Sequence, residues 1–294
     1  MVTFEEWAAR AVPVESGGLR IAAHDDGDRD GPVVTFLHGY PSSSLDVVPM
    51  LDRLVPAGVR VVTLDFPGFG ASAKPADHPY SIDGATDATE DVWRALGVTS
   101  TVVMAHDYGV SVGQELLARQ IDAGEGGDRP ATVTGVVWSN GGLYPDLHRP
   151  TVGQQMLLDP DHGAEVAAAM DEAALANGLR VTWGERRPMT DEVVHGLWQA
   201  LAHDGGSAQA HRLLHYIADR RAHADRWRAS LESGVVPMAF VWGELDPVSG
   251  GHVADRLAER LPDTPLQRLL DVGHWPPLEA PDEVAAAVGG LAGV

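Results

Sequence analysis

The chain has 294 residues and a formal net charge of −21 at neutral pH, because 42 acidic side chains outnumber 21 basic ones. This charge predicts a surface that repels nucleic acid and anionic membranes, and its plainest consequence is solubility. The absence of cysteine excludes disulfides, thiolate catalysis and cysteine-based metal sites. No apolar run approaches the roughly 18 residues that cross a membrane, and the first residues lack a basic and then apolar leader. We therefore expect a cytoplasmic protein.

Six short apolar runs rich in β-branched residues predict buried strands. Each run is bounded by Gly, Pro or Asp, and runs without polar alternation are typical of strands covered on both faces. The segment at 21–32, before the first run, reads as the end of a strand and a turn. In chain order the runs are Val33–Leu37, Val59–Leu64, Thr101–Ala105, Val133–Trp138, Val235–Trp242 and the weaker Leu266–Leu270.

Helical patterns separate these runs. The pattern at Ile82–Leu96 follows Ser81 as N-cap and closes at Gly97, and a second one covers Val110–Gln120. Two more, "GHVADRLAERL" and "PDEVAAAVGGLAG", follow the last strands. Alternating strands and helices predict an α/β fold with a mainly parallel, doubly wound sheet.

The alternation stops between the fourth and fifth runs. Residues 139–234 carry helical patterns such as "HGAEVAAAMDEAALANGL", "TDEVVHGLWQAL" and a long one around "LLHYIADRR". A helical insertion between two core strands predicts a cap over the sheet. We therefore expect a core domain formed by residues 1–142 and 233–294, and a helical cap domain at 143–232.

Two candidate nucleophiles follow the third run. The residues from Gly109 to Gly113 match the serine-hydrolase pattern G-x-S-x-G, with Ser111 in the centre. A hydrolase nucleophile, however, sits on the tight turn directly between strand and helix, flanked by small residues. Asp107 fits that position, between Ala105 and Gly109, whereas Ser111 falls one turn inside the helix. We therefore predict Asp107 as the nucleophile, although an Asp at this place is also an ordinary helix N-cap.

Three further segments support Asp107. After the first strand, "FLHGYPSSS" places Tyr40 where its backbone N–H and that of Tyr108 can form an oxyanion hole. Asp246 lies just past the fifth run, and His274 lies on the loop after the last one. The order nucleophile, acid, histidine is that of α/β hydrolases, and all three follow carboxyl ends of strands, where open α/β sheets place their sites.

With these residues the sequence resembles the Asp-nucleophile branch of the α/β-hydrolase superfamily, which includes epoxide hydrolases and haloalkane dehalogenases. Within that branch it is most similar to the mesoderm-specific-transcript-like hydrolases. The resemblance runs from about Val33 to Pro281. It rests on His38-Gly39-Tyr40-Pro41, "DFPGFGASAKP", "AHDYGVSVGQELLAR", "SNGGLYPDLHRP", "LLHYIADRR", Asp246 and "GHWPPLEAP".

The resemblance implies a reaction in two steps that needs no cofactor or metal. Asp107 attacks an sp³ carbon and forms an alkyl ester, and His274, oriented by Asp246, then activates water to cleave that ester. The reactants would be water and a small apolar epoxide-like molecule, with no nucleic acid or membrane as partner. Monomer and homodimer both stay open.

The resemblance also implies a cap tyrosine that protonates the leaving oxygen, and Tyr216 lies where one is expected. The second cap tyrosine of the family would lie near residues 154–156, and none is there. Tyr144, His148 and Trp183 are candidate substitutes, and Asn140, after a strand end, is expected to face the pocket. His38 and His106 are expected to be structural hydrogen-bonding residues.

The leading hypothesis is a hydrolase that opens an epoxide to a diol. A haloalkane or haloacid dehalogenase with the same Asp107 is the first alternative, although Tyr108 stands where dehalogenases usually carry Trp. A second alternative, from a different class, is a protein on the same fold that binds a ligand or catalyses a rearrangement without hydrolysis.

Overall fold

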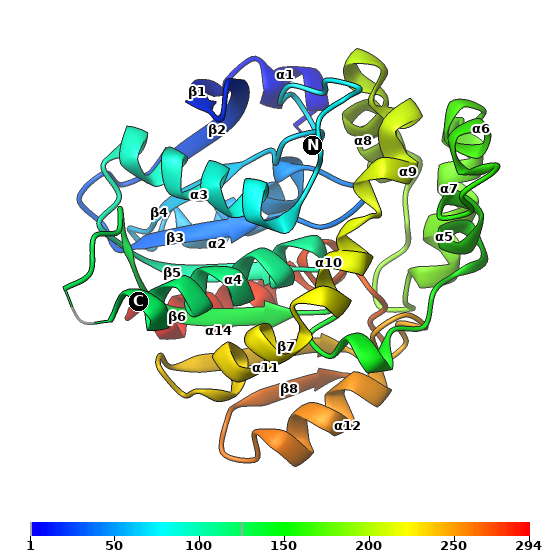
Figure 1. Cartoon of the computed structure of the whole chain (residues 1–294). Coiled ribbons are helices and arrows are strands. Elements are labelled where there is room, and N and C mark those ends of the chain that lie inside the picture. Colours follow the sequence, from blue (N-terminus) through cyan, green and yellow to red (C-terminus); the bar gives the residue numbers. More distant parts are fainter. Residues whose placement is uncertain (1, 125) are drawn as a thin grey trace.

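The computed structural model describes residues 2–124 and 126–294 and shows one twisted sheet between two layers of helices (Figure 1). The order of the eight strands is β1-β2-β4-β3-β5-β6-β7-β8, and all neighbours from β4 to β8 pair in parallel. The strands are β1 (Val12–Ser16), β2 (Leu19–Gly27), β3 (Val33–Leu37), β4 (Arg60–Leu64), β5 (Ser100–His106), β6 (Thr132–Ser139), β7 (Met238–Gly243) and β8 (Leu266–Leu269). This architecture confirms the predicted α/β-hydrolase fold.

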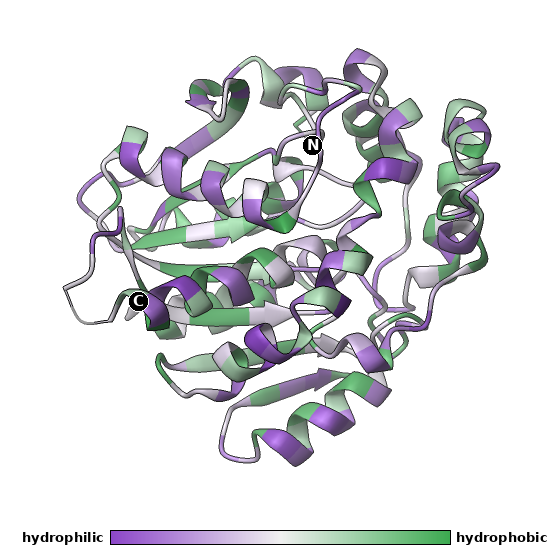
Figure 2. Ribbon diagram, viewed as in Figure 1, coloured by the Kyte–Doolittle hydropathy of each residue, from purple (hydrophilic) through white to green (hydrophobic). Residues whose placement is uncertain are grey.

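The central strands form because their side chains are apolar on both faces. Every residue of β4 is buried, and so is every residue of β5 after Ser100. One face is covered by α3 (Ile82–Leu96), α4 (Tyr108–Ala123) and α12 (Gly251–Arg260), and the other by α2 (Val48–Leu54) and α14 (Pro281–Ala292). Figure 2 shows the resulting pattern, with apolar residues along the strands and polar ones on the outer sides of the helices.

The amino-terminal edge differs from the sequence prediction. The segment expected to hold only a strand end and a turn belongs largely to β2, and β1 has no counterpart among the predicted runs. The two strands form an antiparallel hairpin around Gly17 and Gly18, both with positive φ. β1 is short, contains Pro13 and has only two buried residues, so its pattern is weak in sequence.

The helix ends follow the predicted capping residues. The Ser81 side chain accepts a hydrogen bond from the backbone N–H of Gly84, and Gly97 adopts the left-handed conformation, with a φ of 66°, that ends α3. The fifth predicted run is shorter than expected, since β7 begins only after Pro237, which has no N–H to donate.

The insertion between β6 and β7 is helical, as the sequence predicts. Figure 1 shows its helices α5 to α10 beyond the carboxyl ends of the parallel strands. The last helix, α11, instead packs along α4, where the Trp227 indole donates to Glu115. The helices are α5 (Val152–Leu157), α6 (Gly163–Ala168), α7 (Glu172–Thr182), α8 (Asp191–Ala202), α9 (Ala210–Leu213), α10 (Tyr216–Ala222) and α11 (Ala224–Glu232).

The remaining helices are short or lie at the rim of the core. They are α1 (Phe4–Ala8) and α13 (Pro276–Glu279), with the 3₁₀ turns η1 (Ser44–Val47), η2 (Pro145–Leu147) and η3 (His203–Gln209). In the part of the chain that the structure describes, no helix is long and apolar enough to cross a membrane.

Candidate active site

Asp107 occupies a strained turn between β5 and α4. Its φ of 45° and ψ of −101° are rare for a residue with a side chain, and such strain is concentrated at functional sites. Two glycines make room for the turn. A Cβ on Gly109 would lie 2.3 Å from the carbonyl oxygen of Leu37, and one on Gly39 would lie 2.9 Å from the Cβ of Asp107. This is the geometry of a nucleophile elbow with a carboxylate at its tip.

Ser111 lies one turn further along α4 and is fully buried. Its Oγ accepts a hydrogen bond of 2.7 Å from Nε of Arg220, a residue of α10 in the insertion. The hydroxyl is therefore part of the contact between α4 and the insertion and does not lie at the elbow.

The structure brings Asp107, His274 and Asp246 together. Nδ1 of His274 lies 2.7 Å from Oδ2 of Asp246, and Nε2 lies 3.8 Å from Oδ1 of Asp107. Asp246 also accepts hydrogen bonds from the Ser249 hydroxyl and from the backbone N–H of Val248. The imidazole is thus held at one nitrogen, and the other faces the carboxylate.

These three groups set each other's charge. Burial alone favours neutral His274, but the charge of Asp246 and its hydrogen bond raise the pKa of His274 to about 9. Burial likewise opposes the charge on Asp107, yet His274 and then Arg220 hold the pKa of that carboxyl below its usual value. The free site therefore carries an ionised Asp107, which suits a nucleophile that needs no base.

One backbone donor already contacts the Asp107 carboxylate. The N–H of Tyr40 donates to Oδ2 over 2.9 Å, and the following bond, Tyr40–Pro41, is cis. Among the described residues, no hydrogen bond joins the N–H of Tyr108 to this carboxylate. Of the two predicted oxyanion donors, the structure thus shows Tyr40 alone in contact.

Two histidines support the loops around the elbow. In His38, Nδ1 bonds the carbonyl oxygen of Gly39, and Nε2 accepts from the N–H of Phe66. A ring nitrogen of His106 lies 2.8 Å from the carbonyl oxygen of His274. Burial, and next the charge of His274, lower the pKa of His106 to about 4, so this ring is neutral. Its hydrogen bond connects β5 to the loop that carries His274.

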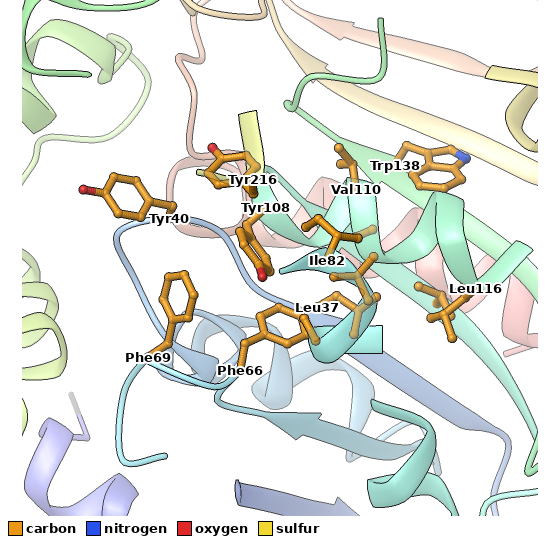
Figure 3. Close-up of a cluster of buried hydrophobic side chains, with 14 of the residues drawn as sticks. Leu37, Tyr40, Phe66, Phe69, Ile82, Tyr108, Val110, Leu116, Trp138 and Tyr216 are labelled. Atoms are coloured by element: carbon orange, nitrogen blue, oxygen red, sulfur yellow. The ribbon is translucent and has the colours of Figure 1, made fainter. Parts of the chain in front are cut away.

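Tyr216 reaches the elbow from α10. Its hydroxyl lies 3.4 Å from Oδ1 and 3.5 Å from Oδ2 of Asp107. Its ring meets the edge of Tyr108 at 4.9 Å between centroids, and Tyr108 in turn packs on Phe66 and Phe69 (Figure 3). A layer of aromatic rings therefore fixes the phenol beside the carboxylate.

Arg220 is a site residue that the sequence analysis missed. It lies four residues after Tyr216, on the same face of α10, and is 2% exposed. Its Nη2 donates to the backbone oxygen of Asp107 over 2.6 Å and lies 3.7 Å from Oδ1. The sequence marks Arg220 only by its spacing of four residues from Tyr216, and this spacing is too common to identify a site residue.

Asn140 and Trp183 are not where the sequence analysis expected them. Asn140 is fully buried behind the site, and its amide bonds Gly243 and Asp246, so it supports the acid instead of facing the pocket. The Trp183 indole donates to the carbonyl oxygen of Arg187, and the residue lines a different hollow, beside α8.

The other two candidate substitutes also lie outside the cavity at Asp107. The Tyr144 hydroxyl donates to Glu232, under the guanidinium of Arg256. His148 lines a separate hollow with His215 and Arg221, and neither of its ring nitrogens has a partner among the described residues. Burial, and next the charge of Arg220, lower the pKa of His148 to about 4.

A cavity of about 710 Å³, including its open mouth, lies in front of Asp107 and His274. Its wall is mainly apolar. The insertion contributes most of it, through Leu157, Met170, Leu175 and Leu179, and the core adds Val248 and Trp275. Such a pocket suits a small apolar molecule presented to one carboxylate. Among the described residues, no group of three His, Asp or Glu side chains is arranged to hold a metal ion.

Two relatives match most of the chain in sequence. The chain is 33% identical over 284 residues to LipZ of Mycobacterium tuberculosis, which carries a provisional description as a hydrolase, and the match covers 96% of this chain and 95% of LipZ. It is 33% identical over 271 residues to the mesoderm-specific transcript protein of Mus musculus, covering 90% of this chain and 80% of that protein.

Two solved structures share the fold at low identity. The haloalkane dehalogenase DbeA of Bradyrhizobium elkani superposes with a TM-score of 0.79 and 21% identity, covering 96% of this chain and 97% of DbeA. A Klebsiella pneumoniae protein provisionally described as an epoxide hydrolase superposes with a TM-score of 0.78 and 18% identity, and the match covers 98% of each chain. Residues 32–281 match the sequence family described as alpha/beta hydrolase fold, and the chain belongs to this family of hydrolases.

Proposed function

We propose that the protein is a hydrolase that opens an epoxide to a diol through an alkyl ester on Asp107. The observation that carries this proposal is the Tyr216 hydroxyl, which lies 3.4 Å from an ionised carboxylate at the elbow. A carboxylate there attacks carbon, and a phenol beside it supplies the proton that an epoxide oxygen needs as the ring opens.

In the first step, an oxygen of Asp107 attacks an epoxide carbon in line with the C–O bond that breaks. The electron pair of that bond goes to the epoxide oxygen, which takes the proton of the Tyr216 hydroxyl. The N–H of Tyr40 keeps Oδ2 in place, so Oδ1, which faces His274, is the attacking atom.

In the second step, water attacks the ester carbonyl carbon of Asp107. His274 takes a proton from that water, and Asp246 stabilises the imidazolium that forms. The N–H of Tyr40 donates to the developing oxyanion, an interaction typically worth about 3 kcal/mol. As the intermediate collapses, His274 returns its proton to the departing alkoxide, which leaves as the diol. The new carboxyl group of Asp107 gives its proton to the Tyr216 phenolate, and both residues are back in their starting states. No cofactor takes part.

Dehalogenation is the second candidate, because DbeA is a haloalkane dehalogenase and the nucleophile would be the same. A departing halide needs N–H donors instead of a proton. The one tryptophan among the residues that line the cavity, Trp275, already donates its indole N–H to Thr182 over 3.0 Å. The side-chain hydroxyl beside Asp107 is the phenol of Tyr216, and a hydroxyl that can give up a proton favours an oxygen leaving group.

Intact mass spectrometry of a His274→Gln variant tests the proposal. Without its base the enzyme should retain the ester, so incubation with a panel of epoxides should add the whole mass of one epoxide. Asp107→Ala in the same background should abolish the adduct. The same variant is incubated with haloalkanes in parallel to test the alternative. An added mass equal to that of the haloalkane minus that of the released acid HX would establish dehalogenation. An adduct that survives Asp107→Ala would contradict both reactions at this residue.

A further inference from the structure

Arg220 is an unusual cation for its place. It is 2% exposed, and its two short hydrogen bonds go to neutral acceptors, the Ser111 hydroxyl at 2.7 Å and the Asp107 backbone oxygen at 2.6 Å. Neither bond neutralises its charge. A buried guanidinium without a counter-ion is strongly unfavourable.

The carboxylate of Asp107 is the counter-ion that the structure offers. Among the described residues it is the one acidic group within ion-pair distance of Arg220, at 3.7 Å from Nη2 to Oδ1. The same guanidinium lies over the Tyr216 ring, 4.5 Å from its centroid. One cation therefore contacts both groups that change charge in the proposed ring opening.

The charge leaves Asp107 when the ester forms. The carboxylate becomes a neutral ester, and the negative charge moves to the epoxide oxygen and, with proton transfer, to the phenol oxygen of Tyr216. The guanidinium of Arg220 lies beside both of these groups. Its short bonds to Ser111 and to the Asp107 backbone also do not depend on the carboxylate, so they hold the guanidinium in place when the ester forms.

We propose that Arg220 is a positioning residue that stays beside one negative charge during ring opening, first on Asp107 and then on the leaving oxygen and Tyr216. This inference rests on the proposed function. Burial and the charge of Asp107 raise the pKa of Tyr216, whereas Arg220 lowers it. Ester formation removes the Asp107 charge and leaves Arg220 in place, so the phenol becomes a better acid at the moment it is needed.

The test measures single-turnover ester formation by rapid quench and intact mass, in the His274→Gln background. Arg220→Met should slow ester formation about 10- to 100-fold, the rate equivalent of losing one hydrogen bond to a charged group. It should also move the acid limb of the pH profile to higher pH, because Asp107 loses a cation. Arg220→Lys, which keeps the charge, should leave that limb in place. Added guanidinium should restore part of the rate in Arg220→Ala.

Arg221→Met is the matched control, because Arg221 is the next residue, is exposed and has no polar contact among the described residues. Equal rates and equal acid limbs in Arg220→Met and Arg221→Met would overturn the inference while leaving the proposed function intact. If the His274→Gln parent itself forms no ester with any epoxide, it is the proposed function that fails.

A stability measurement decides the matter if Arg220→Met does not fold. Asp107→Asn in the His274→Gln background keeps the shape of the side chain but removes the counter-ion, so the Tm should fall by several degrees. Active-site charges usually destabilise a fold, and their removal then raises the Tm. A Tm that rises in this variant would show that Arg220 does not depend on Asp107, and the inference would be wrong.

Discussion

Nε2 of His274 lies 3.8 Å from Oδ1 of Asp107. That distance is too long for a hydrogen bond and suits two groups that do not exchange a proton with each other. In a serine hydrolase the histidine must bond the nucleophile, because it removes the proton of the hydroxyl. In the reaction that we propose, Asp107 is already ionised, so His274 has no proton to remove from it before the ester forms.

The first prediction separates Asp107 from Ser111. Asp107→Ala should abolish turnover, since no other side chain occupies the elbow. Ser111→Ala should keep at least about a hundredth of the wild-type kcat/KM, because it removes one hydrogen bond of the Arg220 guanidinium, worth about 1.5–3 kcal/mol. Steady-state kinetics on the epoxide identified by mass spectrometry measures both. A dead Ser111→Ala beside an active Asp107→Ala would reverse the assignment.

The second prediction concerns the pH dependence of ester breakdown. His274 is the base only in its neutral form, and its pKa in the free site is raised to about 9 by Asp246 against the effect of burial. The ester removes the charge of Asp107, which is one of the causes of that increase. The rate of ester breakdown should therefore rise with pH and level off below about 9. Rapid-quench measurements across pH 5–10 test this, and a rate independent of pH would contradict a histidine base.

The third prediction concerns the two cap tyrosines. Tyr216→Phe should slow ester formation from an epoxide about 100-fold or more, within the usual range for removing a general acid. Tyr144→Phe is the matched control, since the Tyr144 hydroxyl donates to Glu232 outside the cavity and its loss should change the rate less than threefold. Equal effects in the two variants would remove Tyr216 from the acid role.

Local patterns allowed the fold and the elbow to be predicted from sequence. Continuous apolar runs identify buried parallel strands, and Asp107 stands directly between such a run and a helix, which fixes its place without any knowledge of distant residues. The positions of Asp246 and His274 near Asp107 could be predicted for the same reason. Each follows the end of a strand, and those ends share one edge of the sheet.

Residues whose role depends on distant packing could not be found this way. Arg220 contacts Asp107 from a helix 113 positions along the chain, and nothing local distinguishes it from the exposed Arg221 that follows. Asn140 does follow a strand end, but the direction of its amide is set by hydrogen bonds to Gly243, at the end of β7, and to Asp246, in the loop after β7. Trp183 lies in the expected insertion, yet the packing of that insertion turns it toward another hollow.

The fourth prediction concerns the close approach at the elbow. A Cβ on Gly109 would lie 2.3 Å from a backbone oxygen of β3 that cannot move aside, so Gly109→Ala should destabilise the fold by at least about 1–3 kcal/mol. Gly290 is the control, since it is an exposed helical glycine of α14 with open space at the Cβ position. Gly290→Ala should stabilise by about 0.5–1 kcal/mol. Urea unfolding measures both, and similar effects would show that the crowding at Gly109 is relieved by movement.

The fifth prediction concerns a buried acid behind the Tyr40 loop. Asp46, in η1, is 2% exposed, and its Oδ2 is hydrogen-bonded to the Ser42 hydroxyl, which also lies within hydrogen-bond distance of the carbonyl oxygen of Gly39. Burial raises the pKa of Asp46 to about 7, and the nearby charge of Asp65 adds to this against the bond from Ser42. The folded protein thus holds a proton that the unfolded chain releases near pH 4.

The sign of the effect on stability follows from linkage. An acid whose pKa is raised in the fold adds to the free energy of unfolding, and the full amount is present at pH values below its pKa in the unfolded chain. This contribution is lost as pH rises from about 4 to about 7. Asp46→Asn cannot lose this proton, so its stability relative to wild type should increase across that window, by a few kcal/mol in order of magnitude. Unfolding in urea at pH 5 and pH 8 measures the difference, with Asp52→Asn on the exposed side of α2 as control. A difference between wild type and Asp46→Asn that stays constant with pH would show that Asp46 is ionised in the fold throughout, with the Ser42 hydroxyl as donor to its charge.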